Sequence, residues 1–194
     1  MAKGRPRKFD RDDALKTALH LFWTHGYEGT SVALLAEKIG VNPPSLYAAF
    51  GNKEQLFLEA VNYYSRYNGG FYHEAFRKRT SYEVARHILE HEVRLVTMPD
   101  APEGCLMIQG ALVTSPESEP IREQMAAMRR MAEKWMADRF EQARSAGDLP
   151  ADSDPAALAC YIMSVNSGIA VQAKSGATRE ELNKVVELAL RNWP

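Results

Sequence analysis

The apolar positions near the start of the chain recur at the three- and four-residue steps of amphipathic helices. We expect a helix over residues 11–24, ended by Gly26, with its apolar side facing a core. Thr30 or Ser31 can cap a second, shorter helix, which Gly40 ends. Its apolar residues stand at positions i, i+3, i+4 and i+7, namely Val32, Leu35, Ala36 and Ile39.

A third short segment follows directly. Asn42 can cap a helix that starts at Pro43, where the missing N–H costs nothing, and Leu46 and Phe50 are spaced to pack inward. Two short helices joined by a tight glycine turn describe a helix-turn-helix, whose second helix, residues 43–49, would enter a DNA major groove. The same pattern also occurs in ordinary helical bundles, so the spacing alone leaves both interpretations open.

The rest of the chain also has helical periodicity. A segment that starts at Lys53 extends to about residue 68, before Gly69 and Gly70 allow a break. Thr80 and Thr178 each begin a T-x-x-E capping box. The remaining predicted helices span residues 80–98, 102–113, 118–145, 154–174 and 178–192. No alternating β-branched run indicates a strand, so we expect an all-α protein of about nine helices.

Composition narrows the class of protein. The chain has 194 residues, and 45% of them are hydrophobic, enough for a substantial core. No apolar run approaches the ~20 residues that span a bilayer, and the basic N-terminus lacks the apolar core of a signal peptide. We therefore expect a soluble, cytoplasmic protein with no membrane partner. No phosphate-binding glycine loop and no G-x-S-x-G motif is present, so neither a cofactor nor an enzymatic reaction is expected.

Charge is distributed unevenly. The net charge is −1, but residues 1–53 contain eight Lys or Arg and five Asp or Glu, which leaves +3 there and −4 in the remainder. A basic segment attached to an acidic body suits a protein that touches DNA through one end only.

Three motifs in the first third of the chain resemble a known family. The first motif is LFWTHGYEGTS, the second is LAEKIGV, and the third is SLYAAFGNKEQLF. The third motif has the family's order of small residue, Leu, Tyr, two variable residues, Phe, two more, Lys, Glu and Leu. From Phe9 to Phe57 the chain therefore resembles the N-terminal domain of the TetR (AcrR-type) regulators. DAPEGCLMI and GDLPADSDPAALA resemble, more loosely, the C-terminal domains of the ComR-like class of that family.

The resemblance implies a ligand-responsive regulator, most simply a repressor. Residues 1–52 would form an arm and a helix-turn-helix domain, and residues 53–194 an effector-binding and dimerisation domain. Such a protein binds a pseudo-palindromic, double-stranded DNA operator as a homodimer and is released by a small-molecule effector. The sequence identifies neither the effector nor the operator.

Ten residues are predicted to contact DNA. Asn42, Pro43 and Ser45 lie where side chains could meet base edges. Lys53 would stand at a helix N-terminus, where a cation is unfavourable unless an external anion such as a phosphate is near; the family resemblance gives Tyr47 a similar role. The N-terminal arm is either a solvated tail or a phosphate-following segment. The full set is Arg5, Arg7, Lys8, Thr30, Ser31, Asn42, Pro43, Ser45, Tyr47 and Lys53.

The effector pocket is predicted around an acid in an apolar setting. Glu92 falls in the middle of the apolar arc of the helix over residues 80–98, so it needs either a structural partner, such as an arginine, or a ligand. Cys105 and Met107 are soft metal ligands, but they point about 200° apart on a helix and are expected to pack in the core. The predicted lining is Leu89, Glu92, Cys105, Met107, Ile108, Met125, Met128 and Trp135, which favours a small hydrophobic or cationic organic ligand over an anion.

The last two predicted helices carry apolar seams with small residues between them. Two such antiparallel helices can pair with the same two helices of a second copy, and the family resemblance implies this dimer interface. The predicted interface residues are Leu158, Ile162, Val165, Ile169, Leu182, Val186 and Ala189.

An alternative class of function rests on one motif. His87, Glu90 and His91 read H-x-x-E-H, the order of zinc proteases in which two histidines bind the metal and the glutamate is the base. On a helical wheel this trio points away from the apolar arc or lies at its edge, and a further carboxylate ligand is missing. Cys105 and Cys160 have no C-x-x-C spacing, so neither a disulfide framework nor a cysteine zinc site is expected. We predict no metal site and keep a metal-handling or hydrolytic all-α protein as the alternative.

Overall fold

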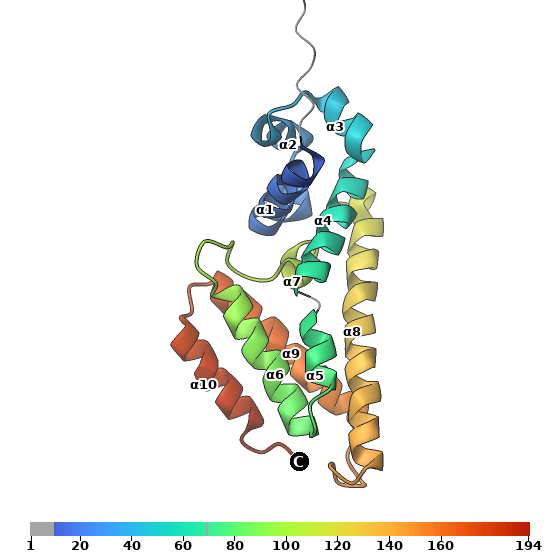
Figure 1. The fold of residues 1–194 in the computed structure, drawn as a ribbon, viewed down its shortest axis with the longest axis vertical. Coiled ribbons are helices and arrows are strands. Elements are labelled where there is room, and N and C mark those ends of the chain that lie inside the picture. Colours follow the sequence, from blue (N-terminus) through green and yellow to red (C-terminus); the bar gives the residue numbers. More distant parts are fainter. Residues whose placement is uncertain (1–9, 69) are drawn as a thin grey trace, which may run out of the picture.

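The computed structural model describes residues 10–68 and 70–194, and these ranges contain α-helices and one 3-10 turn but no strand (Figure 1). A small unit at one end of the molecule consists of α1 (Arg11–Gly29), α2 (Val32–Ile39) and α3 (Pro43–Phe50). The connecting helix α4 (Lys53–Asn68) leads from it towards the body. The all-α prediction is confirmed, with ten α-helices in the described ranges.

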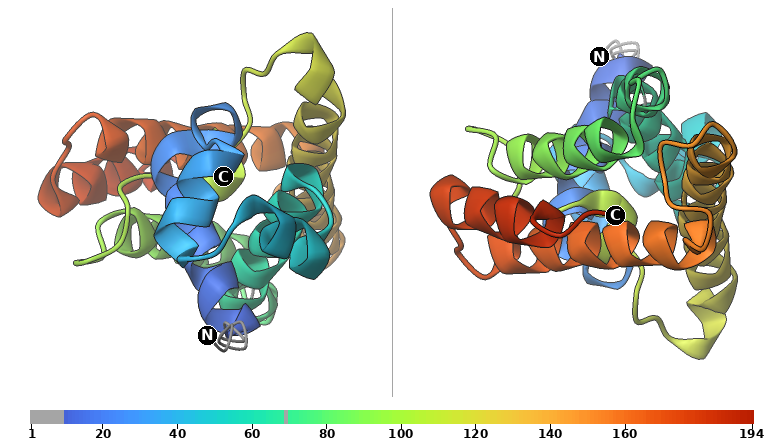
Figure 2. Two further views of the ribbon diagram at one scale, coloured as in Figure 1. Left: turned by 90° about the horizontal axis from the view of Figure 1, so that it is seen from above. Right: turned by 90° about the horizontal axis from the view of Figure 1, so that it is seen from below.

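The body is a bundle of longer helices. Its elements are α5 (Gly70–Phe76), α6 (Ser81–Val96), the short α7 (Leu106–Gln109), a 3-10 turn (Pro116–Ser118), α8 (Glu119–Ser145), α9 (Pro155–Lys174) and α10 (Arg179–Leu190). Viewed from below, α10 lies along α6 and α9, and α8 crosses one end of α9 (Figure 2). The upper part of α8 extends beside the connecting helix α4 (Figure 1).

Local capping explains where most helices begin. Ser31 accepts a hydrogen bond from the Leu34 amide at 3.0 Å, and Asn42 accepts one from the Ser45 amide at 2.9 Å. Both predicted T-x-x-E sequences form complete capping boxes at the starts of α6 and α10. These bonds satisfy backbone donors that a helix N-terminus otherwise leaves unpaired.

Two helices differ from their predicted lengths. α1 continues to Gly29, but Gly26 interrupts it with φ 71° and ψ 177°, a left-handed φ that favours glycine. The helix predicted over residues 102–113 is only the four residues of α7, because Gly104 has φ 86° just before it and Cys105 supplies no side-chain cap.

The small unit is fixed to α4 by ring packing and one ion pair. The rings of Phe22 and Phe57 meet edge to face with centroids 5.0 Å apart. Arg11 donates two hydrogen bonds to the Glu59 carboxylate, at 2.5 and 2.7 Å, and its guanidinium lies 4.5 Å from the centre of the Phe50 ring. Helices α1, α3 and α4 therefore share one core.

The α9 helix corrects an expectation about apolar length. Pro155–Lys174 has 20 residues, a mean hydropathy of 1.4 in its most apolar window, and only 33% of that window buried within the chain. By length and composition this helix could cross a bilayer, contrary to the expectation that no apolar run is long enough. Core helices of soluble proteins pass the same test, and one face of α9 packs against α6 and α8. Its other face is uncovered.

Candidate DNA-reading surface and effector site

The α2–α3 pair has helix-turn-helix geometry. Gly40 takes the left-handed conformation at the turn, with φ 78° and ψ 32°, and its amide donates to carbonyls at the end of α2. Leu35, Leu46 and Phe50 point inward and are buried. The inward side of α3 is thus used for packing, and its opposite side is free to face a groove.

The outward face of α3 contains residues that sequence reasoning missed. Pro44 and Ala48 are exposed beside the predicted Pro43 and Tyr47, whereas Ser45 is only half-exposed. A helical wheel drawn from the inward-facing residues could have found them, because Pro44 and Ala48 are four residues apart on the opposite side. These two side chains offer apolar surface, which can contact a thymine methyl group.

Two predicted DNA contacts have local structural roles, and for the exposed Ser31 the DNA contact stays a prediction. Thr30 is fully buried, and its hydroxyl donates to the carbonyl of Gly26 at 2.7 Å. Its assignment to DNA is therefore wrong, because the hydroxyl ties down the end of α1. Ser31 caps α2 and remains exposed.

The phosphate-facing assignments differ in exposure. The Tyr47 side chain is 46% exposed on α3. The Lys53 ammonium lies 4.1 Å from the centre of the Tyr27 ring, and partial burial lowers the pKa of Lys53. Lys53 therefore braces the start of α4 against α1, and its phosphate contact stays a prediction. Arg5, Arg7 and Lys8 lie outside the described residues.

Glu92 is the most unusual group in the body. Its side chain on α6 is buried, and its Oε1 has no hydrogen-bond partner. Burial raises the pKa of Glu92 to about 7, an effect that the neighbouring Cys105 and Asn166 side chains partly offset as hydrogen-bonding partners. Burial also raises the pKa of the Cys105 thiol, so this cysteine is protonated. The predicted arginine partner is not found for Glu92 in the described ranges.

The structure brings most of the predicted pocket residues inside the body, with one exception. Leu89, Cys105, Ile108 and Met125 are buried, and Met107 and Met128 are partly buried against the same core. Trp135 does not belong with them, because its side chain is 51% exposed on the outside of α8. That residue was misassigned, since an apolar side chain near the edge of a helical stripe can face either way.

One groove of the body does not coincide with the predicted pocket. It is an open groove of about 520 Å³ between α6, α10 and the C-terminal residues, and none of the eight predicted pocket residues lines it. Tyr82, Arg86 and Trp193 are among its walls. The Glu92 region is instead closely packed.

A set of hydrogen bonds connects the Glu92 region to the small unit formed by α1, α2 and α3, the candidate DNA-reading unit. The Trp23 indole donates to the carbonyl of Gly104 at 2.8 Å, and the Tyr27 amide donates to the carbonyl of Gly110 at 2.7 Å. The Trp23 ring also meets the Tyr64 ring edge to face, 4.8 Å between centroids. The end of α1 is therefore docked on the α7 segment.

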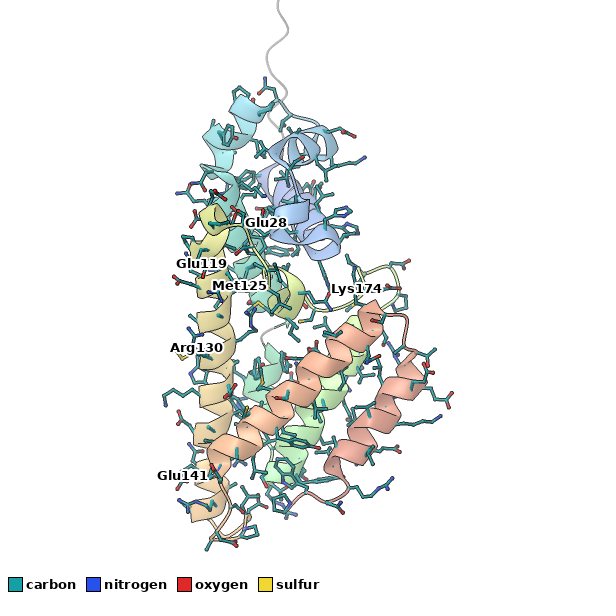
Figure 3. The ribbon with its side chains drawn as sticks, turned by 180° about the vertical axis from the view of Figure 1, so that it is seen from behind. Glu28, Glu119, Met125, Arg130, Glu141 and Lys174 are labelled. Carbon is teal, nitrogen blue, oxygen red and sulfur yellow. The ribbon has the colours of Figure 1, made fainter. Side chains whose placement is uncertain are left out.

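The same contact zone continues at the start of α8. Glu28 accepts a hydrogen bond from the Ser115 amide at 2.9 Å, and backbone and side-chain bonds from this turn lower the pKa of Glu28. Figure 3 shows Glu28 beside the end of α8 where Glu119 lies, with Met125 further along the same helix. A displacement of α7 or of this turn would therefore reach α1 directly.

The predicted dimer seam is part of the core of a single chain. The residues Ile162, Ile169, Leu182 and Val186 are buried within the protomer, and Leu158, Val165 and Ala189 pack against the same core. The four buried side chains are therefore covered within one chain, and a dimer contact stays a prediction for the partly buried Leu158, Val165 and Ala189. Apolar side chains on α9 and α10 that do remain exposed are Tyr161, Val171, Val185 and Leu188.

The H-x-x-E-H residues do not assemble a metal centre. His91 stacks on the Phe71 ring of α5 at 3.9 Å, and burial lowers the pKa of His91 to about 4. His87 has its Nε2 atom 3.8 Å from the Glu74 carboxylate. Within residues 10–68 and 70–194, no group of three or more His, Cys, Asp or Glu side chains could hold a metal ion.

Comparisons with known proteins cover both halves of the chain. A model described as "Bacterial regulatory proteins, tetR family" matches residues 14–60, and one described as "Tetracyclin repressor-like, C-terminal domain" matches residues 84–189. The HTH-type transcriptional repressor ComR of Escherichia coli is 35% identical over 100% of this chain and 93% of its own length. BdcR, another HTH-type transcriptional repressor of that organism, is 28% identical over 96% of this chain and 90% of its own.

A solved structure agrees over nearly the whole chain. It is a cysteine mutant of the TetR family transcriptional regulator CifR in complex with 26-base-pair double-strand operator DNA, 42% identical to this chain. The match covers 98% of this chain and 100% of that one, with a TM-score of 0.92. The arrangement of α1–α4 on the body is therefore similar to one that was observed on DNA.

Proposed function

This chain belongs to the TetR family of bacterial regulatory proteins, and on that basis we propose that it represses transcription as a homodimer on a pseudo-palindromic operator and is released by a small-molecule effector. As a member of this family it is a DNA-binding transcriptional regulator and not an enzyme. The alternative that used His87, Glu90 and His91 for hydrolysis is therefore wrong.

One observation carries the proposal. The exposed face of α3 stands at the end of the molecule, on a helix whose opposite face is locked into the core by Leu46 and Phe50. A rigid helix with a free outer face is what entry into a major groove requires. The 42% identical relative with the same arrangement was solved on operator DNA, which supports the same use of α3 here.

We further propose that the boundary between two domains lies just before Lys53. Residues 1–52 form the domain that binds DNA, and residues 53–194 form the domain that binds the effector and dimerises. The names of two full-length relatives, both called repressors, support repression as the sign of regulation. An effector bound near Glu92 would have to favour the DNA-incompetent arrangement, with a coupling of about 1–3 kcal/mol between the two sites.

Gel-shift and footprinting experiments with the DNA upstream of the protein's own gene test this function. We expect salt-sensitive binding and a protected site with two similar half-sites, since each chain presents one α3. Lys184→Ala, an exposed change on α10, serves as a control for general loss of charge. Binding that is absent, or that shows no footprint at any salt concentration, would contradict the proposal.

Changes on the outer face of α3 should alter base preference. Substituting Ser45 or Ala48 changes groups that face the groove, and we expect the preferred operator to shift by about 1–3 kcal/mol at one or two base pairs. Tyr47→Phe removes only a hydroxyl that we assign to a phosphate, so it should lower affinity for all operators equally. Selection from a randomised operator library distinguishes the two. A shifted preference in Tyr47→Phe with none in the Ser45 and Ala48 variants would reverse the assignment.

The N-terminal arm should contribute affinity without specificity. Replacing Arg5, Arg7 and Lys8 with Ala is expected to flatten the log–log salt dependence of operator binding by about 0.9 for each phosphate that the arm no longer neutralises. Base preference should survive. A triple alanine change of Lys134, Lys184 and Arg191, exposed cations of the body, is the matched control. Equal slopes in the arm variant and the wild type would show that the arm does not follow DNA.

The α1–α7 contact should matter for DNA binding. Trp23→Phe keeps a ring but removes the donor to Gly104, so we expect a loss of about 1 kcal/mol in stability and up to about fivefold in operator affinity. Trp193→Phe is the matched control, because it also removes an indole hydrogen bond, to Ser81, but at the far end of the body. Denaturation and gel shifts measure both. If the two variants lose the same operator affinity, the contact does not hold α1 in its DNA-binding position.

A further inference from the structure

One oxygen of the Glu92 carboxyl group has no hydrogen-bond partner, although the side chains of Cys105 and Asn166 bond to the group. Its side chain is buried, with only 4% of the residue exposed, and its Oε1 accepts no hydrogen bond. No lysine or arginine forms an ion pair with it in the described part of the chain. An unpaired buried acceptor destabilises the folded state, so the fold retains this group at a cost in stability.

The groups around Glu92 come from several elements, and those closest to it are neutral. α4 contributes Tyr64, α5 contributes Tyr72, the start of α7 contributes Cys105, and α9 contributes Asn166. Burial and the nearby Glu92 and Cys105 groups raise the pKa of both tyrosines, so their hydroxyls are protonated.

One cation of α8 approaches the neighbouring Cys105 but is engaged elsewhere. Arg129 interacts electrostatically with Cys105, and it donates to the carbonyl of Met107 at 2.9 Å. Burial and the neighbouring arginines of α8 lower the pKa of Arg129. Among the residues that the structure describes, the free oxygen of Glu92 therefore has neither a hydrogen-bond donor nor a cation paired with it.

We propose that the effector site is centred on Glu92 and takes a compact organic ammonium ion, whose N–H group donates to Oε1 and whose binding displaces the carboxyl proton. This inference rests on the proposed function, because it names the ligand class of the same regulator. The exchange is balanced: the protonated carboxyl group and the ammonium ion give a carboxylate–ammonium pair, and one proton passes to the solvent. No covalent bond to carbon or sulfur forms or breaks.

Physical chemistry separates this ligand class from its competitors. An anion next to Glu92 would place two like charges in a buried site, and a neutral ligand without a donor would leave Oε1 unpaired. An ammonium ion gains a charge-assisted hydrogen bond, and the rings of Tyr64 and Tyr72 can add cation–π attraction. The Glu92 region is closely packed, so a ligand of a few heavy atoms has to displace side chains to enter. Met107 and Met128 are flexible and only partly buried against the core, which makes them the side chains that can move.

The position of the site couples it to the helices that bind DNA. Cys105 faces Glu92, and the preceding residue, Gly104, holds the Trp23 indole of α1. A ligand between Glu92 and Cys105 must displace the start of α7, and with it the hydrogen bond that docks α1. Binding at Glu92 would therefore be transmitted to α1 through Cys105 and the adjacent Gly104.

Calorimetry on the full-length protein tests the ligand class without DNA. The probes are methylammonium, butylammonium and benzylammonium, with benzyl alcohol and phenylacetate as neutral and anionic counterparts of benzylammonium. Titrations at pH 6 and pH 8, each in two buffers that differ in ionisation enthalpy, count the protons released. We expect an ammonium probe to bind at least tenfold more tightly than its counterparts, with release of close to one proton per chain at pH 6 and much less at pH 8.

A variant and a ligand-independent measurement complete the test. Glu92→Gln should abolish proton release and weaken ammonium binding at least tenfold, whereas Glu90→Gln, a change at the surface of α6 where Glu90 pairs with Arg86, should do neither. Infrared difference spectra between wild type and Glu92→Gln should show the carbonyl band of a buried protonated carboxyl group at pH 6, and circular dichroism confirms that the variant is folded. The proposal is overturned if no ammonium probe binds, if benzyl alcohol or phenylacetate binds as well, or if binding releases no proton at pH 6. Absence of operator binding by the wild type would instead contradict the proposed function. The calorimetric and infrared results would not be affected by that outcome.

Discussion

Glu92→Gln is expected to gain stability relative to the wild type as the pH rises, by up to about 3 kcal/mol between pH 4.5 and pH 8. The pKa of Glu92 is raised to about 7 by burial, so between pH 4.5 and pH 7 the native protein holds a proton that the unfolded chain has released. Stability of the wild type therefore falls over this window. Glutamine has no proton to lose, so the variant does not share this decline.

Denaturant unfolding of both proteins at several pH values measures the effect. The other titrating groups, such as His91, whose pKa is lowered to about 4, are common to both chains and cancel in the difference. Glu90→Gln on the same helix is the control, and the loss of its surface ion pair with Arg86 should cost less than about 1 kcal/mol at every pH. A difference between wild type and Glu92→Gln that stays constant from pH 4.5 to pH 8 would show that Glu92 is ionised in the native state.

Local signals made the DNA-reading unit predictable. The caps at Ser31 and Asn42, the glycine turn at Gly40 and the inward spacing of Leu46 and Phe50 are all properties of neighbours in sequence, and the structure confirms them. Glu92 could be found in the same way, because a single acid in an apolar helical arc is conspicuous without any tertiary information.

Errors arose where tertiary packing decides the direction of a side chain. Threonine commonly caps a helix from an exposed position, so Thr30 was expected at the surface. The kink at Gly26 instead brings the carbonyls of α1 within reach of its hydroxyl. The α7 segment was predicted too long, since Gly104 forces a turn that no apolar periodicity reveals. Trp135 lies at the edge of a stripe, and only the positions of the neighbouring helices show that it faces outward.

The predicted dimer seam also depended on tertiary packing that the sequence does not reveal. An apolar stripe on a helix has the same pattern whether it is covered by its own chain or by a second copy. Ile162 and Leu182 turn out to pack inside one protomer, and only the placement of α6 and α8 could distinguish this from a dimer contact. The uncovered side of α9 and α10 is therefore the better candidate for the interface.

This uncovered side has the properties of an interface between copies. Tyr161 and Val171 on α9 and Val185 and Leu188 on α10 are between 41% and 61% exposed, and Gly168 has nothing within 4 Å of the position that a Cβ would take. The Tyr161 hydroxyl donates to the Ala189 carbonyl at 2.9 Å, which holds the two helices as one surface. Large exposed apolar side chains next to small residues suit close packing against an identical surface.

Leu188→Glu is therefore expected to convert the proposed dimer to monomers that no longer bind the operator. Leu188 is 61% exposed in the protomer, so a carboxylate there leaves the fold of one chain intact but is buried in the dimer, twice by symmetry, at a cost of several kcal/mol. Ile162→Glu should differ, because it places a charge in the core and unfolds the chain itself. Val113→Glu, at an 86% exposed apolar residue outside α9 and α10, is the matched control and should remain a dimer. Sedimentation velocity at micromolar concentration, with circular dichroism for helix content, separates these cases. A Leu188→Glu protein that sediments as the wild-type dimer would place the interface on another face of the molecule.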